Sequence, residues 1–335
     1  MADVEYFLDE TPGETRGIVA RGGEYHALYI ERSSDPVQHR RGTRQIGRVA
    51  RVEPGLKAAF IDLGVGDLFA FMALPKNIRL DVGAKVEITV SAEPRESKGA
   101  VVKYVGPASG DVRVLEAGPS VRDRMHSMAG DQLMTGLAAL RASLEAEEAA
   151  LTTVFQKAEF GLDLSVERTR ALVSVDIDYA PLPGRDSRKG REAVNRAGLF
   201  EAARIICLKG WGGLVVVDLA GVYLQAESVN QAARQAFAPF EDVAYGPLSR
   251  FGALQLSLPW HGRPVDEVLR DSVAAPLGAL RRLNLAIHED RTQPVWTLEA
   301  GPQWSNLLKP LVAELGPRAR LVIKEQGAAL KVSKG

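Results

Sequence analysis

A-L-V-S-V-D-I-D-Y (residues 171–179) and G-G-L-V-V-V-D-L (residues 212–219) are two apolar runs that each carry an aspartate near the carboxyl end. Their length and β-branched content are typical of buried strands, and residues 193–208 between them have apolar side chains at helical spacing. The stretch therefore predicts a βαβ unit. Because the crossover in such a unit is right-handed, the two strands should lie parallel and close together, with Asp176 and Asp218 at their carboxyl ends.

Asp176 and Asp218 predict a metal site at this edge of the sheet. Open α/β sheets hold their ligands at the carboxyl ends of the strands, where two carboxylates would repel each other unless a hard cation lay between them. Mg²⁺ suits a site of one or two carboxylates that water and phosphate oxygens complete. The loop between the runs carries Arg185, Arg188 and Lys189, which favours a phosphate substrate. The alternative is that each aspartate only caps a helix or anchors a loop.

Composition narrows the classes of protein that fit. The chain has 335 residues, which suits two or three domains, and its formal net charge is zero, so any contact with nucleic acid must come from local basic patches. A single cysteine excludes an intramolecular disulfide and a cysteine-built zinc site. There is no apolar run of 18 residues and the first residues are acidic, so we expect a cytoplasmic protein that does not bind membranes.

Residues 36–108 have the pattern of a small barrel. Short alternating segments are separated by Gly and Pro at intervals of about 8–12 residues. The arginine-rich run R-R-G-T-R-Q-I-G-R-V-A-R (40–51) precedes Phe60, Phe69 and Phe71. That combination fits a barrel in which aromatic rings stack on bases and arginines follow the phosphates. The alternative is that these phenylalanines fill the interior of the barrel.

The motifs of these regions resemble the ribonuclease E/G family. I-G-R-V-A-R-V-E-P-G-L-K-A-A-F-I-D-L-G (46–64), with the later F-A-F-M-A-L and S-K-G-A, is similar to that family's S1-type RNA-binding domain. A-L-V-S-V-D-I-D, F-E-A-A, G-G-L-V-V-V-D-L and S-R-F-G-A-L-Q-L-S are similar to its nuclease domain and come in the same order. The resemblance covers residues 44–106 and 161–258.

The resemblance implies a Mg²⁺-dependent endoribonuclease that hydrolyses phosphodiester bonds in single-stranded RNA. Asp176 and Asp218 match the family's metal-binding aspartates, and Asp178 stands where the family has an asparagine that orients the first of them, so these three form the implied catalytic set. Leu63 stands where an aromatic residue is common. Together with the basic residues of the two loops, the matching positions give an expected RNA-binding set of Phe60, Phe71, Lys98, Arg44, Arg48, Arg185, Arg188, Lys189 and Arg250. For Arg250 a solvated arginine at a strand end is the alternative.

The implied fold class is α/β, with an S1-type oligonucleotide-binding (OB) barrel inserted into a reduced ribonuclease-H-like support. The expected domains are the support (1–35 with 109–160), the barrel (36–108), the metal-binding nuclease domain (161–262) and a small α/β C-terminal domain (263–335). In the last we expect a helix (265–283), a strand, a helix (305–315) and a strand.

Two departures from the family pattern change the expected partners. Residues 110–160 are too few for the pocket with which longer relatives sense a 5′-monophosphate, so we expect indifference to 5′ phosphorylation. The cysteine pair that links relatives into zinc-bound tetramers is missing, which leaves a monomer or a weak homodimer.

Two other functions stay open on the sequence. The first is an RNA-binding protein on the same fold that is catalytically weak or inactive, because the 185–191 loop and position 178 depart from the family pattern. The second is a metal-dependent phosphoesterase for small phosphates, which rests on the aspartate pair alone. The barrel argues against the second function.

Overall fold

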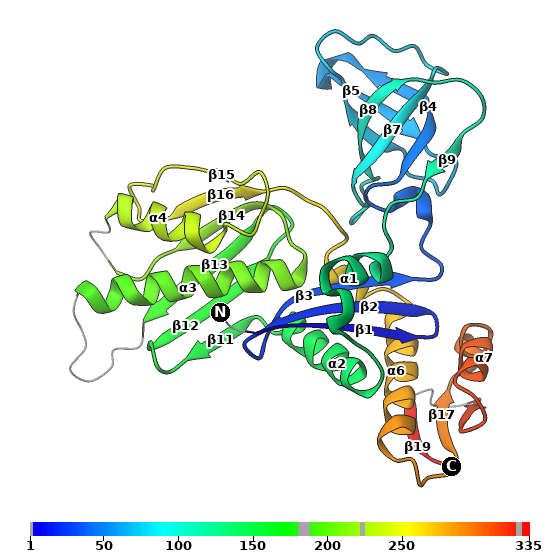
Figure 1. The fold of residues 1–335 in the computed structure, drawn as a ribbon. Coiled ribbons are helices and arrows are strands. Elements are labelled where there is room, and N and C mark those ends of the chain that lie inside the picture. The colour runs from blue at the N-terminus through cyan, green and yellow to red at the C-terminus, as the bar shows by residue number, and fades with distance from the viewer. Residues whose placement is uncertain (1–2, 180–187, 222–224, 326–329) are drawn as a thin grey trace. The chain divides into compact units, whose positions relative to one another are not determined.

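The chain is a mixed α/β protein that divides into two compact units. The computed structural model describes residues 3–179, 188–221, 225–325 and 330–335 (Figure 1). Unit 1 comprises Met1–Glu24, Leu28–Ala146 and His261–Gly335, and unit 2 comprises Tyr25–Ala27 and Glu147–Trp260. Among the described residues, no helix is both long and apolar enough to cross a membrane.

Unit 1 contains a closed five-stranded barrel. Its strands pair in the order β5-β6-β8-β7-β4, and β5 pairs with β4 to close the ring, while β9 extends the outer edge of β4. Alternate residues of each strand point inward, as the pattern of buried and half-buried residues along β7 illustrates. The strands are β4 (Arg44–Glu53), β5 (Ala58–Asp62), β6 (Ala70–Ala73), β7 (Lys85–Ala92), β8 (Val101–Pro107) and β9 (Arg113–Glu116), with the 3₁₀ helices η1 (Val37–His39) and η2 (Pro54–Leu56) before and within them.

A four-stranded sheet in the order β10-β1-β2-β3 forms a second part of unit 1. Strand β1 pairs in parallel with β10, which joins the two chain segments that the sequence analysis grouped as a support. Helix α1 packs on β1 and β2 and begins with a capping box, in which Ser120 and Asp123 exchange hydrogen bonds. The elements are β1 (Val4–Thr11), β2 (Glu14–Arg21), β3 (Glu24–Arg32), α1 (Val121–Ala129), η3 (Gly130–Gln132), β10 (Leu133–Met134) and α2 (Leu137–Leu151). Residues 25–27 of β3 and 147–151 of α2 are counted with unit 2.

The C-terminal segment of unit 1 has one more helix and one more strand than the sequence pattern indicates. The expected helix over 265–283 is two helices, and a third strand pairs with the central one to give the order β18-β17-β19. Because the last strand is only four residues long, its pattern is too short to predict it. The elements are α5 (Val265–Val268), α6 (Ala274–Glu289), β17 (Trp296–Ala300), η4 (Pro302–Trp304), α7 (Ser305–Glu314), β18 (Ala319–Ile323) and β19 (Lys331–Lys334).

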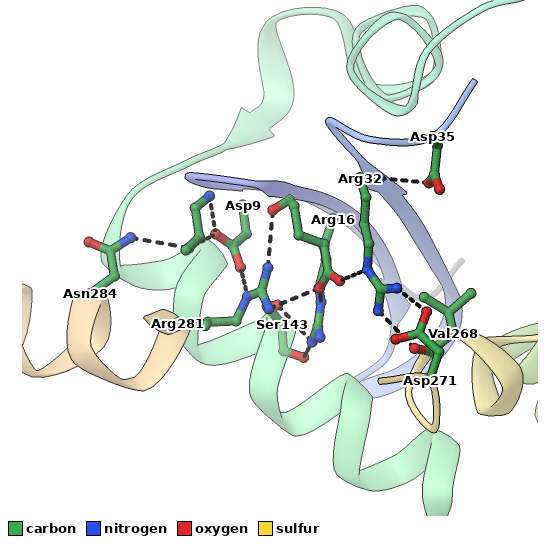
Figure 2. A network of polar contacts seen from close by, with 11 residues as sticks. Asp9, Arg16, Arg32, Asp35, Ser143, Val268, Asp271, Arg281 and Asn284 are labelled. Carbon is green, nitrogen blue, oxygen red and sulfur yellow. Dashed lines mark hydrogen bonds and ion pairs between the residues drawn. The ribbon is translucent and has the colours of Figure 1, made fainter. Parts of the chain in front are cut away.

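Buried ion pairs connect the N-terminal strands of unit 1 with helix α6 (Figure 2). The Glu14 carboxylate accepts from Nε of Arg16 and Nε of Arg32, each at 2.8 Å, and from Nη1 of Arg281 at 3.1 Å. The Asp9 carboxylate accepts from Nε of Arg281 at 2.5 Å. Every one of these side chains is nearly inaccessible to solvent, and each charge has an opposite partner. We name Asp9, Glu14, Arg16, Arg32 and Arg281 the buried ion cluster.

Unit 2 is built on a six-stranded sheet in the order β11-β12-β13-β14-β16-β15. The predicted βαβ unit is confirmed, because β13 and β14 are parallel neighbours and α3 connects them. The other pairings in this sheet are antiparallel. The elements are β11 (Val154–Lys157), β12 (Leu162–Arg168), β13 (Val173–Tyr179), α3 (Arg188–Lys209), β14 (Gly213–Asp218), α4 (Ala226–Ala236), β15 (Ala244–Tyr245) and β16 (Leu254–Leu258).

The strands of this sheet are buried on one face only, which corrects the expectation of fully buried strands. Along β13 buried and exposed residues alternate, from Val173 to Tyr179. The buried side chains pack against α3 and α4, which form one core cluster with the sheet. The second face presents exposed residues of β13, β14 and β16. A half-covered sheet is common where most pairings are antiparallel, because only a parallel pair needs a crossover helix.

Candidate functional site

The sheet of unit 2 places Asp176 and Asp218 directly beside each other. In the parallel pairing of β13 with β14, Asp176 is the partner of Asp218. Neighbouring strands lie about 4.8 Å apart, and in-register partners point to the same face of a sheet. Asp218 is the last residue of β14, whereas Asp176 lies within β13, three residues before its end, and not at the carboxyl end as the sequence pattern suggested.

Burial of the alternate residues decides which face the carboxylates occupy. Val175, Ile177 and Val217 are almost fully buried under α3 and α4. Because successive side chains of a strand point to opposite faces, Asp176 and Asp218 must lie on the open face. Gly198 lets α3 approach closely, since a Cβ at this position would lie 2.8 Å from Ile177. The helix therefore holds the buried face of β13 directly behind the carboxylates.

Two further aspartates lie on the same open face. Asp178 is the cross-strand partner of Asp163 in the pairing of β13 with β12. Desolvation raises the pKa of Asp176 above its usual value, and the charges of Asp178, Asp218 and Asp163 raise it further. The charges of three neighbouring carboxylates thus disfavour the ionised form of Asp176, and a bound cation would relieve this effect. Asp163 was not among the sequence-predicted residues, although the alternation in L-D-L-S-V-E (162–167) could have placed it on a polar face.

The donor set fits a cation that takes most of its ligands from water and substrate. Mg²⁺ usually binds through one or two carboxylates together with waters and phosphate oxygens, and Asp176 and Asp218 offer two carboxylates on adjacent strands. Within the described part of the chain, no group of three or more His, Cys, Asp or Glu residues is arranged so that it could hold a metal ion. A cation here would therefore depend on this pair and on non-protein ligands.

The basic residues expected near this site are only partly described. Arg185 lies outside the described residues, and Arg188 and Lys189 are the first two residues of α3. Arg250 lies in an exposed turn after β15, and its guanidinium carbon is 4.8 Å from the centre of the Phe251 ring. The backbone at Arg188 and Lys189 thus begins helix α3, whereas the backbone at Arg250 forms a turn.

The barrel of unit 1 carries its phenylalanines outside its core. The core consists of aliphatic residues and one methionine, and it contains neither Phe60 nor Phe71 nor Phe69. The interpretation that these rings fill the barrel is therefore wrong. Phe60 and Phe71 are cross-strand partners with ring centres 6.0 Å apart in an edge-to-face arrangement. Leu63, in contrast, is buried in the core and offers no surface to a ligand.

Arg51 adds a cation to this aromatic pair and was not in the predicted site. It is the cross-strand partner of Phe60, and its guanidinium carbon lies 4.3 Å from the ring centre. The register between β4 and β5 brings them together across a bulge, which no spacing in the sequence reveals. Arg51, Phe60 and Phe71 therefore form one row on the outer surface of the barrel, which we name the aromatic row. The exposed Phe69 is the residue directly before β6.

The predicted basic residues of the barrel, Arg44, Arg48 and Lys98, differ from one another in their surroundings. Arg44 forms ion pairs with Glu87 at 2.8 Å and Glu116 at 3.5 Å, so its charge is partly neutralised. Arg48 is exposed and lies opposite Asp62 in the ladder. Lys98 is exposed in the turn before Gly99, and this glycine packs so closely against the Phe69 carbonyl that a Cβ would lie 2.1 Å from its oxygen. The backbone beside Lys98 is therefore held close to Phe69.

Comparisons with known proteins provide no family assignment. No protein-family model matches the chain, and no curated protein matches it.

Proposed function

We propose that the chain is a divalent-metal-dependent endoribonuclease of the ribonuclease E/G type that acts on single-stranded RNA. The observation that carries the proposal is the in-register pairing of Asp176 with Asp218 on an open sheet face. The resemblance of the sequence motifs and the position of the phenylalanines outside the barrel core support it. The barrel would then be of the S1 OB type, and the sheet of β1, β2, β3 and β10 would be the reduced ribonuclease-H-like support.

Asp176 and Asp218 would hold Mg²⁺ in this proposal. A bound divalent cation supplies Lewis-acid stabilisation of charge at a phosphate and lowers the pKa of water. The residues of the chain would bind this cation and orient it. Both aspartates provide anionic oxygens from adjacent strands, and Asp178 adds negative charge two residues along β13. Desolvation, together with the charges of Asp178, Asp218 and Asp163, raises the pKa of Asp176, and a cation at this carboxylate would offset both effects.

Phe60 and Phe71 would bind the RNA strand by stacking on its bases. Stacking on aromatic rings is tolerant of sequence because every base has a flat face, and arginines beside the rings contact phosphates or stack in turn. Arg51 lies over Phe60 and so belongs to this surface. The barrel of unit 1 would bind the strand, and the carboxylates of unit 2 would act on its phosphodiester.

The test is cleavage of a short unstructured RNA by the full chain and by Asp218→Asn. We expect cleavage in Mg²⁺, loss of cleavage in EDTA, and a fall of at least about a hundredfold in the variant, because residues that only support a metal ligand already contribute about 10–100-fold. Glu167→Gln is the matched control, since Glu167 is an exposed acidic residue of β12 in the same sheet. Cleavage that persists both in EDTA and in Asp218→Asn would rule out the proposal.

A second candidate function is single-stranded RNA binding without catalysis. The position of the phenylalanines outside the core favours it independently of any metal. Phe71→Leu should weaken RNA binding by about 1–3 kcal/mol, or about 5- to 150-fold, which is the contribution of one stacked base. Val105→Ala, which trims another exposed apolar side chain of the barrel, is the control. Strong binding that Phe71→Leu weakens, without cleavage in Mg²⁺ or Mn²⁺, would select this function.

A further inference from the structure

Helix α3 is hydrogen-bonded to the segment that follows Asp218. Asn195 lies in the second turn of this helix and is only 4% exposed. Its side-chain amide donates from Nδ2 to the carbonyl oxygen of Ala220 at 3.0 Å. Its Oδ1 accepts from the backbone N–H of Ala220 at 2.8 Å. One carboxamide therefore satisfies both backbone groups of a residue two positions beyond Asp218.

These two bonds hold the chain just beyond Asp218, where the described part of the sheet offers no second neighbouring strand. Asp176 has ladder partners on both sides, Ser165 on β12 and Asp218 on β14. Among the described residues, Asp218 has a ladder partner on β13 alone, because the ladder between β14 and β16 ends at Val217. The end of β14 is therefore less constrained by the sheet than the middle of β13. A carboxamide that pairs with both N–H and C=O constrains the backbone as a neighbouring strand would.

A second contact of the same helix supports this segment. Gly221 has φ +93°, a conformation that favours glycine, and the chain turns there after Ala220. The aliphatic part of Arg191 lies against it, since a Cβ on Gly221 would be 2.8 Å from Cδ of Arg191. Arg191 and Asn195 are one helical turn apart on α3. The helix therefore holds Ala220 and Gly221 through two neighbouring residues.

We propose that Asn195 is a positioning residue for Asp218, which keeps this carboxylate in place to share a cation with Asp176. The inference rests on the proposed function and deepens it. Because only Leu219 lies between Asp218 and Ala220, movement of Ala220 is transmitted directly to the end of β14. In the part of the chain that the structure describes, no group of three or more possible ligands is arranged to hold a metal ion, so the displacement of one of the two carboxylates would not be compensated there.

The experiment measures Mn²⁺ binding by the full chain with Asn195→Leu, which keeps the shape of the side chain and removes both hydrogen bonds. We expect the dissociation constant for Mn²⁺ to rise about 10–100-fold, as for other residues that orient a metal ligand. Hydrogen exchange at the Ala220 amide should accelerate as well. Asn195→Ala gives the same test if the leucine variant does not fold. In RNA cleavage measured in parallel, Asn195→Leu should lower kcat by a larger factor than it raises KM.

Glu201→Gln is the matched control on the same helix. Glu201 is buried and paired with Arg204 and Lys157, so its replacement destabilises unit 2 without removing a hydrogen bond to Ala220. This control should lower the melting temperature and leave the Mn²⁺ dissociation constant within about twofold, well below the 10–100-fold range of orienting residues.

The outcomes separate this inference from the proposed function. If the unaltered chain binds no Mn²⁺, the proposed function fails and this inference fails with it. If the unaltered chain binds Mn²⁺ and Asn195→Leu binds it equally well, the inference alone is overturned. If Glu201→Gln weakens Mn²⁺ binding as much as Asn195→Leu, the effect is one of general stability and the positioning role is also overturned.

Discussion

The buried ion cluster of unit 1 and the open carboxylate face of unit 2 use the same kind of charged group under opposite conditions. In the buried ion cluster, the Glu14 carboxylate is enclosed by three arginines. On the open face, Asp176 is surrounded by three other aspartates. Burial alone would raise the pKa of Glu14, but Arg16, Arg281 and Arg32 lower it to about 2. The pKa of Asp176 is raised by desolvation and by its neighbours.

The two regions show which carboxylates the fold itself requires. A carboxylate that is buried among arginines is stabilised within the chain, and removing one partner leaves an uncompensated charge. A carboxylate that lies among other carboxylates on an exposed face is not stabilised within the chain. Such a group is a candidate for binding a ligand of opposite charge. The three predictions below test this distinction, from the largest expected effect to the smallest.

Arg281→Met should break the buried ion cluster. It leaves Asp9 without its arginine and Glu14 without one of three, and the loss of one partner from a buried ion pair typically costs about 3–5 kcal/mol. Urea unfolding monitored by circular dichroism measures the change. Arg282→Met is the matched control, because Arg282 is the next residue of α6 and is exposed. Equal stability of the two variants would show that the cluster does not hold α6 to the N-terminal strands.

Glu14→Gln should cost stability in a manner that depends on pH. The pKa of Glu14 is lowered from 4.5 to about 2 in the folded state, so its ionised form stabilises the fold above pH 4.5. The difference of about 2.5 pKa units corresponds to about 3 kcal/mol near neutral pH. This advantage is lost as the pH falls through 4.5 towards 2, where the glutamate is protonated and resembles glutamine.

The measurement is the free energy of unfolding of both chains between pH 7 and pH 2. The two curves should converge on acidification. Glu10→Gln is the control, since Glu10 pairs with Arg122 at the surface, and a surface pair contributes at most about 1 kcal/mol. A gap between Glu14→Gln and the unaltered chain that stays constant over this range would contradict the assignment.

Asp176→Asn should slightly stabilise the metal-free chain at pH 7. Because the pKa of Asp176 is raised in the folded state, its ionised form is a cost that appears as the pH rises above 3.8. Asparagine avoids this cost, and the gain should stay below about 1 kcal/mol, as for other cross-strand pairs. Thermal unfolding in EDTA at pH 7 and pH 3 measures it, and the gain should vanish at pH 3.

Magnesium should reverse the order of these two chains. It binds the folded form of the unaltered chain and stabilises it, whereas the variant lacks one ligand. An Asp176→Asn chain that is less stable than the unaltered one in EDTA at pH 7 would show that the carboxylate contributes to the fold.

Local patterns in the sequence predicted several of the elements that build the site. The β-branched runs and the helical spacing between them indicated the βαβ unit, and the right-handed crossover of such a unit predicted that Asp176 and Asp218 are neighbours, as they are. Alternating segments with Gly and Pro between them indicated the barrel. These predictions succeeded because strand periodicity and the geometry of a single crossover depend on residues that are close in the chain.

The alternation of residue types along each strand is local in the sequence, and it sets which side chains share a face. Which of the two faces is covered depends on how distant elements pack. The tertiary structure placed Asp163 beside Asp178, left Phe60 and Phe71 outside the barrel core, and brought Arg281 to Asp9 across 272 positions of the chain. It also brought Asn195 to Ala220. The physical reason is that burial and ion pairing depend on which distant elements pack together, and no local periodicity encodes that choice.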